Sequence, residues 1–317
     1  MINQILQGDS LTVLKTLPDQ SIQTCITSPP YYGLRDYGVD GQIGLERTVT
    51  EYVENLVFLF REVKRLLKDD GTLWLNLGDS YAGSGKGAWK EKNKQKHHYV
   101  PDPESPQVKI KHDGFKPKDL IGIPWRVALA LQEDGWYLRS DIIWNKPNAM
   151  PESVTDRPTK SHEYIFLLSK SPNYNYDHES IKESAIYGTQ DVRGSNGAFG
   201  PQQNYRRSDK PRGSFDGKHG SESFRAIRDT RNKRSVWTVT TKPFKHAHFA
   251  TFPLDLIEPS VLAGSRENDL ILDPFFGSGT TGLAALEHNR NFVGIELNPE
   301  YIKIAKKRLA AVQMSFI

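Results

Sequence analysis

The sequence has few sulfur-bearing side chains and no long apolar run. Its 317 residues include one cysteine, Cys25, which cannot form an internal disulfide or supply the several thiolates of a zinc or iron–sulfur site. No run approaches the roughly 18 apolar residues of a membrane-spanning helix. The N-terminus lacks the charged and then apolar layout of a secretory signal. These absences exclude disulfide-stabilised secreted proteins and predict a soluble, cytoplasmic protein with no membrane partner and no metal site.

The positive charge is concentrated in two segments. The chain carries a net charge of +4, but residues 83–118 hold nine lysines against four acidic side chains, and residues 173–245 hold fourteen basic against eight acidic side chains. The rest of the chain therefore has a net charge of −7. Two basic segments on an acidic body favour a polyanionic partner such as nucleic acid. Solvated, lysine-rich loops are the alternative explanation.

The apolar pattern predicts an α/β fold in a chain long enough for one large domain. Apolar residues recur every three or four positions between the apolar runs, which indicates helices. One helix is expected to start at a capping box of Thr48 and Glu51 and to end at Gly71; others start at Pro124 and after Asn298-Pro299. Alternating strands and helices are typical of a doubly wound, mostly parallel sheet with helices on both faces. The seven expected strands are residues 2–6, 22–27, 72–77, 138–144, 163–168, 270–272 and 292–295.

The two basic segments interrupt this alternation. Residues 83–118 are rich in Gly, Lys, His and Pro without periodicity, which predicts a mobile insertion. Residues 173–245 intersperse aromatic side chains among Asn, Arg, Ser and Gly, and their pattern matches no regular sandwich or helical bundle.

A glycine-rich turn near the C-terminus is the most informative motif. A strand that ends at Asp273 is followed by Gly277, Gly279 and Gly282 in G-x-G-x-x-G spacing, then by a helix and a strand that ends at Glu296. Glycines let the backbone approach a ligand closely, and an acidic residue after the second strand can accept both hydroxyls of a ribose. A tight turn without a ligand is the alternative for the glycines alone. The order of strand, turn, helix and acid favours a nucleoside site.

Two features favour S-adenosylmethionine over a dinucleotide as the ligand. Only 21 residues follow Glu296, so strands from the N-terminal half must complete the sheet, in a circularly permuted order. Asp273 directly before the loop suits a ligand with a positively charged ammonium, because a carboxylate there would repel a pyrophosphate.

A second motif, Ser28-Pro29-Pro30-Tyr31, follows an apolar strand and is therefore expected at the carboxyl edge of the sheet. The two prolines stiffen the turn and remove two backbone donors. An exocyclic base amine needs acceptors on its N–H groups before its lone pair can attack a methyl group. Ser28 Oγ and the Pro29 carbonyl can supply them, and Tyr31 offers a face for an extruded base. A simple strand-ending turn is the alternative.

Together the Ser-Pro-Pro-Tyr turn and the loop Asp-Pro-Phe-Phe-Gly-Ser-Gly-Thr resemble the DNA amino-methyltransferases. That family methylates exocyclic amines and carries (D/N/S)-P-P-(Y/F/W) with D-P-F-x-G-S-G-T, and the order here is similar to its β arrangement. The resemblance covers nearly the whole chain outside the two basic segments. It implies a catalytic half in residues 1–172, target recognition in residues 173–245 and a cofactor-binding half in residues 246–317.

The resemblance also implies roles for individual residues. Ser28, Pro29, Pro30 and Tyr31 become the catalytic turn. Asp9 is expected near the cofactor adenine, although a strand-end cap also explains it, and Phe275 and Phe276 fit either adenine contacts or the core. The expected cofactor-binding residues are Asp9, Phe249, Asp273, Phe275, Gly277, Ser278, Gly279, Thr280, Thr281 and Glu296. The expected DNA-binding residues are Arg206, Arg207, Arg212, Arg225, Arg228, Arg231, Lys233 and Arg234.

The predicted reaction is transfer of a methyl group from S-adenosylmethionine to the N4 amine of cytosine in double-stranded DNA, by base flipping. Serine at position 28 resembles the N4-cytosine enzymes, and N6-adenine is the alternative within the family. Cys25 is expected in the core, which argues against ring-carbon cytosine methylation because that chemistry needs an exposed thiol. RNA or protein methylation, a nicotinamide-dependent oxidoreductase and a non-catalytic DNA-binding protein remain more distant alternatives. A cognate restriction endonuclease and a homodimer are compatible with such a chain.

Overall fold

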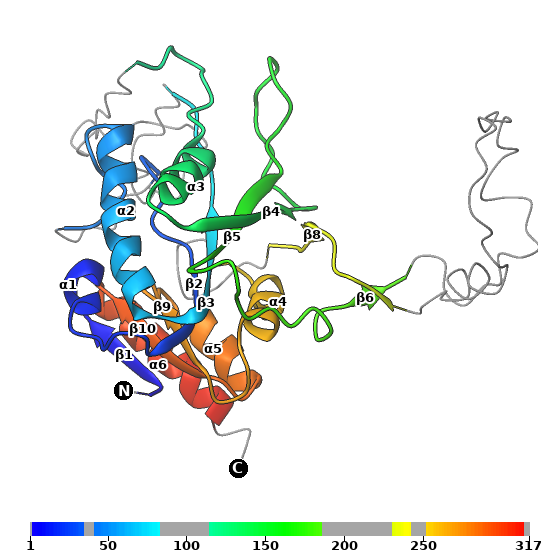
Figure 1. The fold of residues 1–317 in the computed structure, drawn as a ribbon. Coiled ribbons are helices and arrows are strands. Elements are labelled where there is room, and N and C mark those ends of the chain that lie inside the picture. The colour runs from blue at the N-terminus through cyan, green and yellow to red at the C-terminus, as the bar shows by residue number, and fades with distance from the viewer. Residues whose placement is uncertain (1, 35–40, 83–113, 186–229, 242–251, 314–317) are drawn as a thin grey trace, which may run out of the picture. The chain divides into compact units, whose positions relative to one another are not determined.

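In the computed structural model the chain is described at residues 2–34, 41–82, 114–185, 230–241 and 252–313 (Figure 1). Two compact units result, one from Met1–Asp177 with Arg234–Ile317 and one from His178–Lys233. The larger unit contains β1 (Gln4–Gln7), α1 (Ser10–Leu14), β2 (Ile22–Thr27), α2 (Val49–Leu66), β3 (Leu67–Leu77), α3 (Ile123–Glu133), β4 (Tyr137–Asn145), β5 (His162–Ser169), β8 (Val236–Thr238), α4 (Leu254–Gly264), β9 (Leu270–Asp273), α5 (Thr280–Glu287), β10 (Asn291–Glu296) and α6 (Pro299–Gln313).

The larger unit is built on one sheet whose strand order is β1-β10-β9-β2-β3-β5-β4-β8. Strands β9 and β10, from the end of the chain, lie between β1 and β2, from its beginning. The predicted circular permutation is therefore confirmed. The permutation matters for the site, because it brings the carboxyl ends of β1, β10, β9 and β2 to one edge.

The seven predicted strands are all present, and the sheet is mostly parallel, but two details differ. Strand β5 runs antiparallel to both of its neighbours, because β4 and β5 follow each other in the chain and pair directly. An eighth strand, β8, pairs with the end of β4, so the prediction of seven strands is one too few. Its three residues lie in the polar segment 173–245, and of the three only Trp237 is buried. Three residues are too few to show the alternating pattern from which a strand is predicted.

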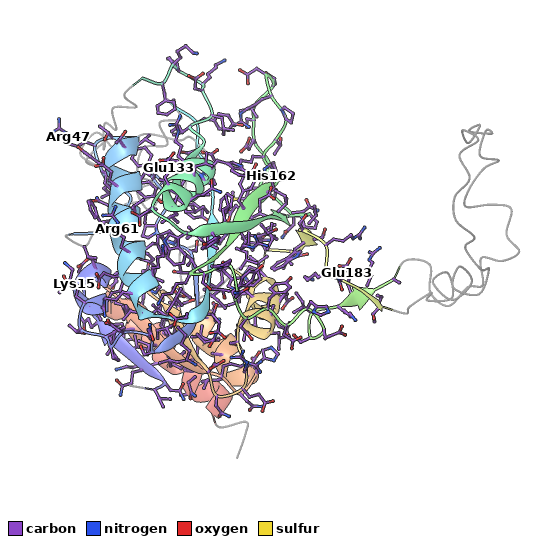
Figure 2. All side chains as sticks on the ribbon, in the orientation of Figure 1. Lys15, Arg47, Arg61, Glu133, His162 and Glu183 are labelled. Carbon is purple, nitrogen blue, oxygen red and sulfur yellow. The ribbon has the colours of Figure 1, made fainter. Side chains whose placement is uncertain are left out.

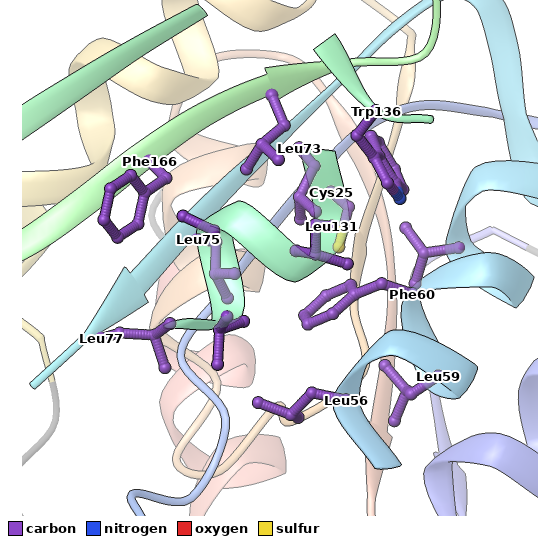
Figure 3. Close-up of a cluster of buried hydrophobic side chains, with 14 of the residues drawn as sticks. Cys25, Leu56, Leu59, Phe60, Leu73, Leu75, Leu77, Leu131, Trp136 and Phe166 are labelled. Atoms are coloured by element: carbon purple, nitrogen blue, oxygen red, sulfur yellow. The ribbon is translucent and has the colours of Figure 1, made fainter. Parts of the chain in front are cut away.

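One face of the sheet is covered by α1, α2 and α3 (Figure 1). Thr48 and Glu51 form the predicted capping box at the start of α2. Figure 3 shows Phe60 of α2 and Leu131 of α3 packed with Cys25 and Leu73 of the sheet, all fully buried. Burial of this apolar stripe, and not helix propensity alone, stabilises α2.

The other face of the sheet is covered by α4, α5 and α6. Side chains alternate between faces along a strand, so Trp74 points away from the cluster that contains Leu73 and Leu75. Gly264, at the end of α4, lies so close to Trp74 that a Cβ atom there would come within 2.8 Å of the indole nitrogen. The predicted doubly wound arrangement is thus confirmed.

Helix α2 ends at Leu66, five residues before the predicted stop at Gly71. Leu67 has extended dihedral angles and begins β3 directly, and Gly71 lies inside that strand. The connection needs no glycine, because an extended residue ends the helix.

The smaller unit, His178–Lys233, contains β6 (Glu183–Ser184) and β7 (Thr230–Arg231), which pair antiparallel. Arg231 Nε contacts Glu183 Oε1 at 2.9 Å across this ladder. Of the predicted mobile insertion, residues 83–118, positions 83–113 lie outside the described residues. No helix in the described parts of the chain combines the length and apolar character needed to cross a bilayer.

Candidate active site

Three hydrogen bonds join segments that are distant in the sequence at the carboxyl edge of the sheet. Gly8 N donates to Glu296 O at 3.1 Å, because β1 and β10 end side by side. Ser10 Oγ donates to the carbonyl of Pro274 at 2.6 Å. Thr27 Oγ1 donates to Asp273 Oδ1, also at 2.6 Å. The glycine loop and the Ser-Pro-Pro-Tyr turn, separated by more than 240 residues, therefore lie next to each other.

The glycine loop follows β9 and has two residues with left-handed backbone. Gly277 has a φ of 51° and Gly279 a φ of 83°, angles that side chains with a Cβ disfavour. Gly279 is also the N-cap of α5. The loop thereby turns sharply from strand to helix. Space is open beside Gly277 for close approach of a ligand, whereas Gly279 is buried and a Cβ there would come within 3.0 Å of Ala305 on α6.

The Phe276 ring packs so closely against two further positions that only glycine fits there. A Cβ on Gly294 would come within 2.3 Å of the Phe276 ring, and one on Gly282 within 2.7 Å. The ring also stacks on Phe292 with centroids 5.3 Å apart, and only 3 % of Phe276 is exposed. Phe276 is therefore a core residue. Phe275, half-buried at the same loop, remains the candidate for an adenine contact.

Asp273 is buried, with 1 % of its surface exposed, and both carboxylate oxygens are engaged. Oδ1 accepts from Thr27 Oγ1 and from Phe275 N at 3.0 Å, and Oδ2 accepts from Thr281 Oγ1 at 2.6 Å. Burial raises the pKa of this carboxyl to about 6, although all three hydrogen bonds lower it. Asp273 thus connects β2, the glycine loop and α5, and both of its oxygens already accept hydrogen bonds from the protein.

Glu296 ends β10 beside the glycine loop. Its Oε2 accepts from Gly277 N at 2.7 Å and its Oε1 from Asn298 N at 2.8 Å. Burial raises the pKa of Glu296 above its ordinary value, while these backbone hydrogen bonds oppose the rise. Each carboxylate oxygen has a second lone pair, and the side chain is half-buried, so this group can accept the two hydroxyls of a ribose.

Arg308 of α6 contacts the glycine loop, a role that the sequence pattern did not indicate. Its Nη1 donates to Ser278 O at 2.7 Å and to Ser278 Oγ at 2.6 Å. The same nitrogen lies 3.2 Å from Thr280 Oγ1. Burial lowers the pKa of this guanidinium. Arg308 is half-buried on α6 beside the buried Leu309, and nothing in the local sequence distinguishes it from a solvated arginine.

Asp9 caps α1. Its Oδ1 accepts from Thr12 N at 2.9 Å and from Thr12 Oγ1 at 2.7 Å, and the side chain is exposed. Of the two explanations for Asp9, strand-end cap and adenine neighbour, this conformation supports the cap. Phe249, the other expected contact outside the loop, lies beyond the described residues.

The Ser-Pro-Pro-Tyr turn is fixed by neighbours on two elements. Tyr52 Oη, from α2, donates to the carbonyl of Pro30 at 2.9 Å. Gly78, directly after β3, lies under the Tyr31 ring, since a Cβ there would come within 2.5 Å of it. Pro29 is buried and Ser28 half-buried. The turn therefore presents its serine hydroxyl from a rigid backbone.

Tyr31 reaches a polar cluster between β3 and β5. Its Oη donates to Glu163 Oε2 at 2.7 Å and lies 3.2 Å from Asn76 Oδ1. Glu163 also pairs with Lys146, which follows β4. Burial raises the pKa of Tyr31 well above its ordinary value, and the negative charge of Glu163 raises it further. The sequence pattern missed Glu163, because a single acid at the start of an apolar strand gives no signal.

His162 begins β5 (Figure 2), and the basic side chains Lys146 and Lys160 lie near it. Lys160 Nζ is 4.0 Å from Asp79 Oδ2, and burial lowers the pKa of this lysine. Burial and the neighbouring Lys160 likewise lower the pKa of His162.

Cys25 lies in the middle of β2, is fully buried, and burial raises the pKa of its thiol. A buried, protonated thiol is a poor nucleophile. The prediction that Cys25 is a core residue is therefore confirmed, and ring-carbon methylation through this thiol is excluded in this conformation.

Only three of the expected DNA-binding residues fall in the described part of the chain. Arg231 pairs with Glu183 within the small unit, Lys233 is half-buried and Arg234 is exposed. The other five, Arg206, Arg207, Arg212, Arg225 and Arg228, lie outside the described residues.

Comparison with known proteins gives consistent matches. A family model described as DNA methylase, for N6 and N4 methyltransferases, matches residues 22–307. The Type II methyltransferase M.Cfr9I of Citrobacter freundii is 50% identical over 307 residues, covering 96% of this chain and 87% of the relative. The Type II methyltransferase M.SmaI of Serratia marcescens is 48% identical over 306 residues, covering 96% and 90%.

Solved structures share the fold at low identity. The PvuII DNA methyltransferase, described as cytosine-N4-specific, superposes with a TM-score of 0.61 at 18% identity, over 98% of this chain and 91% of the other. A Thermus thermophilus protein described as a DNA modification methylase, in complex with S-adenosyl-L-methionine, has a TM-score of 0.57 at 23% identity. The match covers 97% of this chain and 95% of the other.

Proposed function

Because this chain belongs to the N6/N4 family of DNA methylases, which use S-adenosylmethionine to methylate exocyclic amines of DNA, we propose that its target is the N4 amine of cytosine in double-stranded DNA. The observation that carries the proposal is Ser28 in a rigid turn beside the glycine loop. Serine at this position resembles the N4-cytosine enzymes, whereas aspartate is usual in the N6-adenine enzymes. The fold is compatible with that target, since PvuII DNA methyltransferase shares it.

The turn can activate an amine without a covalent intermediate. The amine lone pair is conjugated with the base, so acceptors on its two N–H groups are needed to direct the lone pair toward the methyl donor. We assign these acceptor roles to Ser28 Oγ and to the carbonyl of the adjacent Pro29, and we propose that the Tyr31 ring, beside Ser28, stacks on a flipped base. Holding amine and methyl donor in line supplies most of the rate enhancement.

The glycine loop is proposed to hold S-adenosylmethionine, which supplies the activated methyl group. Glu296 would accept the ribose hydroxyls, and Phe275 would lie beside the adenine. Gly277 allows close approach of the cofactor to the backbone, and Gly279 lets Ala305 of α6 pack against the loop. Around them, the buried side chains Asp273, Ser278, Thr280 and Thr281 shape the loop, whereas Asp9 caps α1. Phe249 stays a prediction from the motif.

Residues 173–245 are proposed to read the target sequence and to contact DNA phosphates through Lys and Arg. Positive charge in this segment, net +6, supports the proposal. The curated relatives M.Cfr9I and M.SmaI are Type II methyltransferases, so we also propose that a restriction endonuclease cuts the site that this chain protects.

The test is methylation of an unmethylated plasmid with S-adenosylmethionine, followed by digestion to nucleosides and mass spectrometry. N4-methylcytosine supports the proposal, and Ser28→Ala should then lose most of the product while retaining cofactor binding. N6-methyladenine would keep the fold, cofactor and turn but overturn the cytosine assignment. A plasmid library with many sequence contexts removes the risk that the recognition site is absent.

A further inference from the structure

A chain of hydrogen bonds leads from the Ser28 hydroxyl to a carboxylate on β5. Ser28 Oγ is oriented as a donor to Tyr31 Oη at 3.5 Å, and Tyr31 Oη donates to Glu163 Oε2 at 2.7 Å. The first of these contacts is long, as hydrogen bonds of catalytic groups often are before substrate binds. Glu163 is 132 residues from Tyr31 in the sequence, and the pairing of β3 with β5 brings it to the turn.

The carboxylate determines the direction of this chain. A carboxylate can only accept, so Tyr31 has to donate its single proton to Glu163, and its oxygen is then left to accept from Ser28. Asn76 Oδ1, at 3.2 Å, is the alternative acceptor for Tyr31, but it is more distant and uncharged. Burial raises the pKa of Tyr31, so the phenol keeps its proton at neutral pH.

Both oxygens of Glu163 have fixed partners. Lys146 Nζ pairs with Oε1, which leaves Oε2 for Tyr31. The lysine is itself held 4.0 Å from the centroid of the Trp144 ring, and Asn76 Nδ2 donates to Oε2 at 3.3 Å. The side chains of Lys146 and Glu163 are only 17% and 16% exposed, so water competes weakly for these hydrogen bonds.

We infer that Glu163, acting through Tyr31, directs the proton of Ser28 away from the substrate, so that Ser28 Oγ meets the target amine as an acceptor. A serine hydroxyl can donate or accept, and only the accepting orientation draws the amine lone pair out of conjugation. Glu163 is thus a positioning residue for the methyl-transfer step. The inference rests on the proposed role of Ser28, and it does not depend on whether the base is cytosine or adenine.

The decisive variant is Glu163→Gln, which keeps the shape of the side chain. Lys146 offers only donors, so the glutamine carbonyl has to face it and the amide NH₂ then faces Tyr31. Tyr31 can no longer donate to position 163. We expect the single-turnover rate constant for methyl transfer, with DNA and S-adenosylmethionine saturating, to fall about 10- to 100-fold, the loss typical of one hydrogen bond to a charged group. The dissociation constants of both substrates should stay within about twofold of wild type.

A double-mutant cycle separates this role from general packing. Tyr31→Phe keeps the ring and removes the hydroxyl, so it should cause a similar loss, and Glu163→Gln added to it should cost less than about twofold more. Glu152→Gln is the matched control, because Glu152 pairs with Arg157 in the loop between β4 and β5 and touches neither Tyr31 nor Ser28 in the described contacts. It should transfer methyl groups at the wild-type rate.

Each outcome has a distinct meaning. A Glu163→Gln rate within about twofold of wild type overturns the inference, and so do independent, multiplicative losses for Glu163→Gln and Tyr31→Phe. If Glu163→Gln does not fold, as judged by thermal unfolding, an undiminished rate in Tyr31→Phe alone overturns it. Wild-type protein that methylates no DNA amine contradicts the proposed function itself, which the wild-type assay shows before any variant is measured.

Discussion

The hydroxyl of Thr27 donates to the buried carboxylate of Asp273 over 2.6 Å, across 246 residues of sequence. Thr27 is the last residue of β2 and directly precedes Ser28, while Asp273 is the last residue of β9 and directly precedes the glycine loop. One hydrogen bond thus fixes the spacing between the proposed amine acceptor and the cofactor loop. Methyl transfer depends on such spacing, because misplacement of reacting groups by about 1 Å can cost a hundredfold in rate.

Asp273 should make folding stability depend on pH in an unusual direction. Its folded pKa of about 6 lies above the ordinary value of 3.8, so the folded state takes up this proton first. The resulting stabilisation is fully present below pH 3.8 and is lost as the pH rises through about 6. Between those limits the group changes the free energy of unfolding by about 3 kcal/mol. Urea unfolding of wild type and Asp273→Asn at pH 4 and pH 7 measures this effect. The wild type should lose about 2 kcal/mol relative to the variant over that range, because at pH 4 part of the unfolded chain has already lost the proton. A pH-independent difference would contradict the assignment.

Glu296→Gln should weaken S-adenosylmethionine binding about 10- to 100-fold, because the amide removes the charge and one acceptor from the diol site. Isothermal titration calorimetry measures this directly. Glu300→Gln is the control, because Glu300 is exposed, pairs with Lys303 and lies only four residues away. Equal affinity of the Glu296 variant and wild type would show that another group binds the ribose.

Arg308→Met should loosen the glycine loop, since it removes the donor to Ser278 and Thr280 while keeping the aliphatic stem. We expect roughly 1–3 kcal/mol of lost stability from the unpaired buried acceptors and about a threefold to tenfold weaker cofactor affinity. Lys307→Met, on the exposed side of α6, should change neither quantity. An unchanged melting temperature and an unchanged cofactor affinity in Arg308→Met would show that Arg308 does not hold the glycine loop in place.

Gly294→Ala should destabilise the larger unit, because the new methyl group would overlap the Phe276 ring. Overpacking of this kind typically costs about 1–3 kcal/mol, which denaturant unfolding detects. Adding Phe276→Leu removes ring atoms from that space, so the double variant should lose less stability than the sum of the two single losses. Strict additivity would show that the ring is not the obstacle.

Affinity for DNA should fall steeply with salt, because the basic residues of segment 173–245 displace counterions from the phosphates. Fluorescence anisotropy with a labelled duplex, between about 50 and 200 mM salt, gives the slope. A flat response would contradict a phosphate-binding role for this segment.

Local patterns were sufficient for much of this fold. The capping box of Thr48 and Glu51, the apolar stripe of α2 and the apolar runs of seven strands depend on neighbours within a few residues, which the sequence displays directly. Strand β8 was missed because it is three residues long, and the direction of β5 because an apolar run does not encode its partner.

The candidate site was predictable where a motif carries the chemistry and not where packing does. Ser28, Gly277 and Glu296 stand in motifs with fixed spacing, and the described structure brings them to one edge of the sheet. Glu163 and Arg308 stand in no motif, because Tyr31 and Ser278, which they contact at the site, are 132 and 30 residues away and no spacing rule connects them.

The sequence by itself determined the element types, the permuted order of the two motifs and the residue types available for methyl transfer. Tertiary structure alone decided which of those residues interact: that Asp273 is buried between Thr27 and Thr281, that Phe276 is core, and that Glu163 terminates a hydrogen-bond chain from Ser28. The physical reason is that hydrogen-bond direction and burial depend on atoms from several strands at once. Those atoms meet only after the sheet has formed.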